Sequence, residues 1–192
     1  MTVKEQKDTF YLLTESITER SVKDLLDFIC TSVDDSCERL HLLINSQGGE
    51  VALALALARM LLSLPCEVIT YNLANVDSAA ILIFVAGAKR VCLSKSRFFF
   101  HPPTKQINGS KTARELVLLA REIHLDSLRI ANYLEERTKT SKRIWLKKMK
   151  LNTHLGICDA YDLGLITSLE HYRIPLHWNS YAYGRDGASP YE

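Results

Sequence analysis

The sequence predicts an α/β fold with a largely parallel sheet, because strand-like and helix-like segments alternate along it. Short apolar runs have the length of buried strands, and the segments between them carry apolar residues at helical spacing. The strand-like runs are 9–13, 41–45, 68–71, 90–93 and 98–101, and the helical segments are 21–29, 50–64 and 78–86. This alternation is typical of βαβ units. A chain of 192 residues has the size of one domain.

The first half of the chain has clear signals for where its helices begin and end. Ser21 is a plausible N-cap for the helix whose apolar positions run from Val22 to Ile29. The second helix, 50–64, is rich in alanine and leucine, and Pro65 ends it. It follows Gly48-Gly49, where two glycines let the backbone approach a ligand or make a tight turn from strand to helix.

Residues 72–87 place one serine, Ser78, at the head of a run of small and apolar residues. The small residues Ala79 and Ala80 favour a buried helix that starts at the serine. Two interpretations of Ser78 stay open. It is either an ordinary helix N-cap, or a nucleophile whose neighbouring free N–H groups receive a developing oxyanion.

The second half begins with a turn at Asn108-Gly109 and a predicted helix from Thr112 to Thr138. A helix of that length suggests an element that projects from the core or packs on a partner subunit. A short basic helix follows at 143–150, and then a helix that stops at Gly164 before a last strand. We expect a single domain with three parts: a head at about 9–103 and 139–169, a handle at about 104–138, and an irregular aromatic tail at 170–192.

Composition excludes several function classes. The net charge of +2 gives no drive toward nucleic acid or an anionic membrane, and no apolar run is long enough to span a bilayer. Five scattered cysteines without a Cys-x-x-Cys pair read as reduced thiols of a cytoplasmic protein, and the polar segment 1–8 carries no signal-peptide core. The histidines lack metal-ligand spacing, so we expect no metal and no cofactor.

His101 is the candidate base. It ends an aromatic strand before Pro102-Pro103, and the carboxyl ends of strands are where α/β proteins place their ligand sites. The alternative is a histidine that merely packs at a strand end.

Several motifs in register resemble those of ClpP, the proteolytic subunit of the Clp protease. They are Ile44-Asn-Ser-Gln-Gly-Gly49, Asp77-Ser78-Ala-Ala80, Val85-Ala-Gly-Ala-Lys89 and Lys95-Ser-Arg-Phe-Phe-Phe-His101-Pro. The order and nearly gapless spacing extend from about residue 9 to residue 167. The resemblance implies a ClpP/crotonase-like stacked βαβ spiral with a long handle helix. It also implies Ser78 as nucleophile, His101 as general base, and the backbone N–H groups of Gly49 and Ala79 as the oxyanion hole.

The chain departs from this family at the third residue of the triad, where Asn152 occupies the position of an aspartate. An amide accepts a hydrogen bond from the histidine Nδ1–H but carries no charge, and such a change can cost about 10⁴ in kcat. Asp159 or Asp77 could substitute only if the fold delivers them to His101. Asp77 stands where the family has alanine, and Gln47 replaces a proline before Gly48-Gly49.

The first hypothesis is therefore a serine endopeptidase subunit with a Ser78-His101-Asn152 triad, which cleaves peptides or unfolded polypeptides inside a ring. By resemblance the ring could be one of two stacked heptamers. The segment that precedes the first strand is shorter than in the family, so we expect weak docking of a Clp-type ATPase. Two alternatives remain: a weak or inactive structural subunit in a mixed ring with a paralogue, and, more distantly, a crotonase-type acyl-CoA enzyme.

Overall fold

The computed structural model describes residues 8–33, 37–169 and 181–183. Its elements follow one another as β1 (Asp8–Leu13), α1 (Glu19–Ser32), β2 (Arg39–Ser46), α2 (Val51–Leu62), β3 (Glu67–Asp77), α3 (Ala80–Phe84), β4 (Lys89–Cys92), β5 (Arg97–Phe100), α4 (Ala113–Arg137), α5 (Lys142–Lys150), β6 (Thr153–Leu155), α6 (Ile157–Asp162) and β7 (Tyr181–Tyr183). The alternation of strands and helices confirms the α/β fold class.

The described strands form one sheet with the order β6-β5-β3-β2-β1-β7, and β4 pairs with β3 beside this path. All pairings are parallel except that of β5 with β6. A parallel pair needs a crossover connection, and the helices α1, α2 and α3 supply the first three crossovers. The predicted parallel sheet is thus present, with one antiparallel strand at its edge.

Strand β3 is the longest strand and serves two neighbours in turn. Its residues 69–72 pair with β4, and its residues 75–77 pair with β5. On its other side it pairs with β2 along most of its length, with a register shift between Ile44 and Ser46. The carboxyl end of β3 therefore lies between the ends of β2 and β5, where the candidate residues gather.

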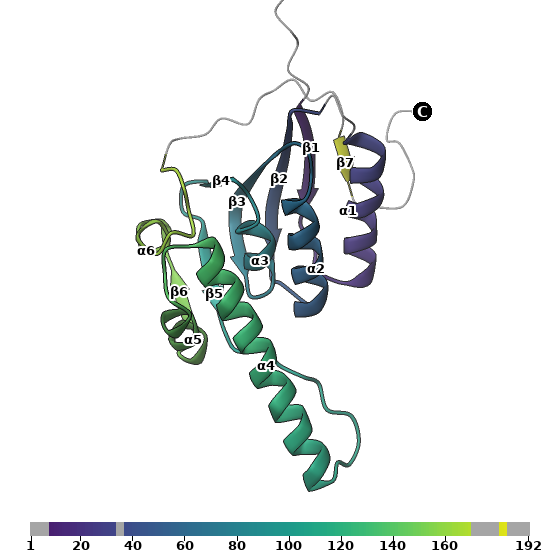
Figure 1. The fold of residues 1–192 in the computed structure, drawn as a ribbon, viewed down its shortest axis with the longest axis vertical. Coiled ribbons are helices and arrows are strands. Elements are labelled where there is room, and N and C mark those ends of the chain that lie inside the picture. The colour runs from purple at the N-terminus through teal and green to yellow at the C-terminus, as the bar shows by residue number, and fades with distance from the viewer. Residues whose placement is uncertain (1–7, 34–36, 170–180, 184–192) are drawn as a thin grey trace, which may run out of the picture.

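Helices α1, α2 and α3 lie together on one face of the strands β1 to β3 (Figure 1). The main hydrophobic core fills this face, and α3 is completely buried in it. Each strand alternates its side chains between two faces. The opposite face of the sheet carries a second, smaller apolar cluster made of Phe10, Leu43, Ile69, Tyr71 and Val91.

Helix α4 extends well beyond the sheet in Figure 1. Its buried residues lie near its C-terminal end, from Ile130 to Leu134, whereas Leu116, Val117, Leu118 and Leu125 are exposed. The predicted helix over 112–138 is confirmed almost to the residue, with Thr112 as its N-cap. The division into head, handle and tail stays a prediction.

Several local predictions were wrong. The strand expected after Gly164 is only an isolated bridge between Val91 and Ser168. The N-cap of α1 is Thr18, whose hydroxyl accepts from the Ser21 N–H in a capping box, so Ser21 is the third helical residue. Strand β3 continues through 72–77, a segment without enough alternation to reveal a strand. The short strands β6 and β7 were missed, and β7 lies in the tail that was expected to be irregular. Three-residue strands form through pairing partners that the local sequence does not contain.

No helix within the described ranges has the length and hydropathy needed to cross a membrane.

Candidate active site

Ser78 lies in a sharp turn between β3 and α3. Its φ of 53° is in the left-handed region, which is uncommon for a residue with a side chain. Its main-chain N–H donates to the Phe99 carbonyl oxygen at 2.8 Å, which holds the turn against the end of β5. The first helical residue is Ala80 and the N-cap is Ala79, so the interpretation of Ser78 as an N-cap was wrong. The half-buried Ser78 sits on an elbow that projects it from the end of the strand.

The loop Gly48-Gly49 packs directly on this elbow. A Cβ added at Gly48 would lie 2.7 Å from the Asp77 carbonyl oxygen and 2.8 Å from the Ser78 Cβ. Both glycines have positive φ, of 92° and 155°. Hydrogen bonds from the Ile17 N–H to Gly48 O and from the Glu50 N–H to Ile17 O fix the loop. The sequence requires glycine here because any side chain would push the loop away from Ser78.

Two main-chain donors next to Ser78 are uncommitted. Within the part of the chain that the structure describes, neither the Gly49 N–H nor the Ala79 N–H donates a hydrogen bond to a protein acceptor. Ala79 lies at the start of α3, where helix geometry leaves N–H groups without intrahelical partners. Donors of this kind can stabilise negative charge on an oxygen bound beside the serine.

His101 follows β5 and is half-buried. Its Nδ1 lies 2.7 Å from the Pro102 carbonyl oxygen. A carbonyl only accepts, so Nδ1 carries the proton and Nε2 of the neutral ring keeps a free lone pair. Gly49, Ser78 and His101 line one cavity of about 590 Å³. The structure thus brings these three predicted residues together, although no hydrogen bond joins Ser78 to His101 among the described residues.

Asn152 is not among the residues that line this cavity, although its neighbour Thr153 pairs with Phe100, the residue before His101. It follows α5 in a left-handed conformation with φ of 48°, and its N–H donates to the Met149 carbonyl oxygen. Its side chain is exposed and is not part of the cavity wall. Among the described residues this side chain makes no hydrogen bond, so the position at His101 Nδ1 is held by Pro102.

Sequence reasoning missed His154, which joins Asp77 and His101 around Phe99. Asp77 is paired with Phe99 across β3 and β5, and Phe99 is paired with His154 across β5 and β6. The Phe99 ring stacks on His154 with centroids 4.2 Å apart and is tilted against His101 at 5.4 Å. His154 gave no signal in the sequence because its strand has only three residues.

Burial raises the pKa of the Asp77 carboxyl, whereas Arg97, His154, a hydrogen bond from the Phe99 main chain and His101 act in the opposite direction. Its Oδ1 atom is buried and has no hydrogen-bond partner among the described residues. A carboxylate that has lost water without gaining a full set of donors is costly for the fold.

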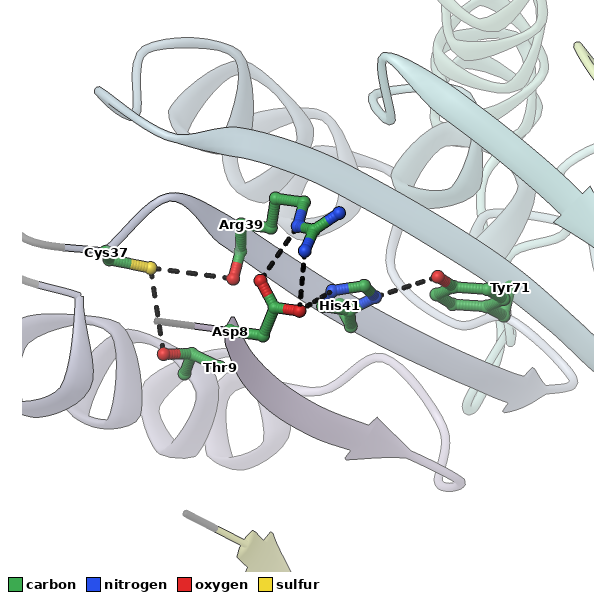
Figure 2. A network of polar contacts seen from close by, with 6 residues as sticks. All are labelled: Asp8, Thr9, Cys37, Arg39, His41 and Tyr71. Carbon is green, nitrogen blue, oxygen red and sulfur yellow. Dashed lines mark hydrogen bonds and ion pairs between the residues drawn. The ribbon is translucent and has the colours of Figure 1, made fainter. Parts of the chain in front are cut away.

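Another histidine, His41, belongs to a buried network at the opposite ends of the strands, shown in Figure 2. Its Nδ1 lies 2.8 Å from the Tyr71 hydroxyl and its Nε2 lies 3.5 Å from Asp8, which forms a double hydrogen bond with Arg39. Burial lowers the pKa of His41 to about 4. A neutral, fully buried ring at the start of β2 is a structural residue, far along the strand from Ser78.

Thiol and metal chemistry have little support. Burial raises the pKa of Cys92 to about 12 and that of Cys66 to about 11, which keeps both thiols protonated and unreactive near neutral pH. Within the described ranges no three His, Cys, Asp or Glu side chains cluster as metal ligands would. Ser78, which shares a cavity with His101 and Gly49, is the nucleophile candidate that the geometry supports.

Comparisons with known proteins agree with the resemblance seen in the motifs. The family model described as Clp protease matches residues 5–172. The chain is 30% identical over 156 residues to the ATP-dependent Clp protease proteolytic subunit of Paracoccus denitrificans, covering 80% of this chain and 75% of that protein. It is 29% identical over 163 residues to proteolytic subunit 1 of Chlamydia felis, covering 83% of this chain and 79% of that protein. A solved structure of a ClpP1 mutant from Listeria monocytogenes shares the fold, with a TM-score of 0.76 and 24% identity, covering 85% of this chain and 92% of that one.

Proposed function

The chain belongs to the Clp protease family as a divergent member, and from that premise we propose that it is a serine endopeptidase with Ser78 as its nucleophile. One observation carries the proposal. The strained Ser78 elbow, the Gly48-Gly49 loop packed on it, and His101 meet at one cavity. A serine in the left-handed region costs the fold free energy, and strain of this kind is found mainly at functional sites. The strain at Ser78 therefore suggests that the position of its hydroxyl has a function.

In the proposed reaction, Ser78 Oγ attacks the carbonyl carbon of a peptide bond while His101 Nε2 takes the hydroxyl proton. The tautomer held by Pro102 leaves Nε2 free for that role. The oxyanion of the tetrahedral intermediate binds the Gly49 and Ala79 N–H groups, each worth about 10²–10³ in kcat. The intermediate collapses as the imidazolium gives its proton to the leaving amine. Water then hydrolyses the acyl-enzyme by the same steps in reverse, and Ser78 is regenerated.

Asn152 is proposed to orient His101 in the engaged conformation of the site. Its amide oxygen would take the place of the Pro102 carbonyl at Nδ1, which keeps the same tautomer. The left-handed turn that carries Asn152 adjoins β6, which pairs with the β5 strand that leads to His101, so a small movement links the two.

Peptides or unfolded polypeptides are the proposed substrates, and rings of this chain are the proposed assembly. The exposed apolar side chains of α4 would be covered by a neighbouring subunit. We propose two possible arrangements of the ring: two stacked heptamers of this chain, or a mixed ring with a paralogue. Weak docking of a Clp-type ATPase stays a prediction, because it depends on positions 1–7, which lie outside the described residues.

A second candidate is a weakly active or inactive subunit of a mixed ring. It is favoured by two observations among the described residues: no hydrogen bond joins Ser78 to His101, and His101 Nδ1 lies against the Pro102 carbonyl oxygen and not against Asn152. The matched family is a protease family, so the acyl-CoA hypothesis is not carried further.

The test is active-site labelling of the purified full-length chain with a fluorophosphonate, followed by mass spectrometry of the labelled peptide. We expect one label on Ser78 and none in Ser78→Ala. The matched control is Ser63→Ala, which removes a hydroxyl bonded to the Met60 carbonyl at the end of α2 and leaves labelling intact. Labelling that survives Ser78→Ala would rule out Ser78 as the nucleophile. A wild-type chain that labels only after a paralogue is added would favour the second candidate.

A further inference from the structure

The Ser78–His101 pair lacks a formal negative charge at its third position, because Asn152 is neutral and Pro102 offers only a carbonyl. The imidazolium that forms when His101 accepts the serine proton is stabilised by a nearby anion in serine proteases. A carboxylate near His101, contributed by another part of the chain, would restore that interaction.

Asp77 is a carboxylate in the right place. It is the last residue of β3 and directly precedes Ser78, and its Cα partner on β5 is Phe99. Side chains alternate along a strand, so Phe99 and His101, two residues apart, point to the same face, and paired residues share that face too. The contact of the Phe99 ring with the His101 ring confirms this placement for β5.

We propose that Asp77 is a positioning residue that supplies negative charge near His101. The neutral amide of Asn152 cannot supply this charge. This inference rests on the proposed function of Ser78 and His101. In this proposal Asp77 supplies the negative charge near His101, and a different residue accepts the hydrogen bond from His101 Nδ1. Asp77 acts through space across Phe99, while a neutral oxygen at Nδ1 sets the tautomer.

The groups around Asp77 agree with a carboxylate whose negative charge has a function. From β5 the groups that face it are Arg97 and His101, and from β6 the facing group is His154. Arg97 is exposed and its Nε donates at 2.8 Å to Asn75, so its positive charge is partly screened by solvent. The Phe99 main chain donates to the carboxyl of Asp77, but no donor in the described part of the chain reaches its buried Oδ1, and burial raises the carboxyl pKa. Such a carboxylate is a burden to the fold.

The cost of the buried carboxylate predicts a change in stability that distinguishes the proposed role of Asp77 from a structural role. A raised carboxyl pKa in the fold means that the ionised form is disfavoured relative to the unfolded chain, so stability falls as pH rises through the titration range. Asp77→Asn removes this cost. We expect the variant to melt roughly 2–4 °C higher than wild type at pH 7, while its reaction with the probe becomes slower. A structural carboxylate would instead lower the melting temperature when replaced.

The experiment measures the rate of fluorophosphonate labelling of the full-length chain from pH 5 to pH 9. For Asp77→Asn we expect a labelling rate at pH 8 reduced about tenfold, because the imidazolium that forms during the attack loses a neighbouring anion. The matched control is Asp162→Asn, an exposed carboxylate at the end of α6, whose labelling rate should follow wild type. If Asp77→Asn is poorly folded, Asp77→Ala is measured in its place.

Two outcomes are kept apart. If Ser78→Ala abolishes labelling while Asp77→Asn has the labelling rate of wild type, the role of Asp77 is overturned and the proposed function stands. If the wild-type chain does not label at Ser78, the proposed function fails and the role of Asp77 fails with it.

Discussion

At the scale of single residues, the candidate site depends on three positions with left-handed or crowded backbone: Gly48, Ser78 and Asn152. Backbone strain of this kind persists only where the surrounding structure enforces it. Two of these positions, Gly48 and Ser78, are in contact, and the third is separate. A substitution at each position can be judged by two measurements, the stability of the fold and the rate of Ser78 labelling.

Gly48→Ala should damage the site more than the fold. The new Cβ would lie under 3 Å from the Asp77 carbonyl oxygen, the Ser78 Cβ and the Ala79 nitrogen, so the elbow must move. We expect a loss of stability of about 1–3 kcal/mol and a fall in Ser78 labelling of at least about tenfold, because small misplacements of reacting groups cost rate.

Gly109→Ala is the matched control for this substitution. Gly109 also has a positive φ, of 69°, but a Cβ there meets nothing within 4 Å. It should lose some stability and keep its labelling rate. Equal labelling rates in the two variants would contradict the contact between the glycine loop and the elbow.

Asn152→Gly tests the orienting role of Asn152 without adding strain. Glycine adopts the φ of 48° freely, so the substitution removes the amide and leaves the turn intact. The exposed side chain makes no described hydrogen bond, and we expect stability to change by less than about 0.5 kcal/mol. Labelling should fall by about tenfold if the amide holds His101 in the engaged state. An unchanged labelling rate, with Asn152→Asp also unchanged, would remove Asn152 from the mechanism.

At the scale of elements, helices that look alike in sequence differ in what their ends support. Thr18 and Thr112 both form capping boxes, with Ser21 and Glu115 as partners. Helix α1 begins against the core, where Ser21, Val22 and Leu25 are buried, whereas the first part of α4 is exposed. The same local interaction should therefore have global consequences in one helix and local ones in the other.

Thr18→Ala should lower the free energy of unfolding by about 1 kcal/mol, the usual value of a lost N-cap. Thr112→Ala removes an equivalent cap, yet the global melting temperature should stay unchanged in the isolated subunit, while amide exchange speeds up over residues 113–118. Calorimetry and hydrogen exchange measure the two effects. A drop in melting temperature for Thr112→Ala equal to that for Thr18→Ala would show that the start of α4 is packed on something.

The buried network on β1, β2 and β3 predicts an acid-sensitive sheet. Because the pKa of His41 is lowered to about 4 by burial, the unfolded chain binds a proton more readily than the fold does. Stability should therefore fall as pH drops from about 6.5 to about 4, by on the order of 3 kcal/mol. His41→Phe should flatten this part of the curve. Urea unfolding at a series of pH values tests it, and equal slopes in both proteins would assign the acid sensitivity to another group.

At the scale of the whole molecule, the chain exposes apolar side chains along α4. Leu116, Val117, Leu118 and Leu125 are exposed on one long helix, and exposed apolar groups of this extent mark interaction surfaces. A ring assembly would bury them and would enclose the Ser78 cavity within a chamber. Self-association is therefore tied to the proposed action on unfolded chains.

Leu118→Glu with Leu125→Glu should shift the assembly toward smaller species, because each carboxylate would be buried unpaired at the proposed contact. Native mass spectrometry and sedimentation measure the change. The control Leu151→Glu alters a leucine that is 63% exposed after α5, and it should leave the assembly size unchanged. A large oligomer that survives the double substitution would place the contact on another surface.

Periodicity, glycine pairs and ordered motifs are local properties, and from them the sequence predicted the fold class, the family and the long helix α4 correctly. The same motifs pointed to Gly49, Ser78 and His101 as site residues, a role that stays a proposal. The sequence did not determine the strand character of residues 72–77, the role of Thr18 as cap, or the strand that carries His154. The two strand segments depend on partners distant in the chain, since a strand is stabilised by its neighbours and not by its own residues. The Thr18 cap is local, but Thr18 and Ser21 are both hydroxyl residues that could cap the helix. Only the tertiary arrangement shows that Asn152 does not line the cavity and that Asp77 lies across Phe99 from His154. The register of β3, β5 and β6 sets these placements, and register is a relation between strands that no single segment encodes.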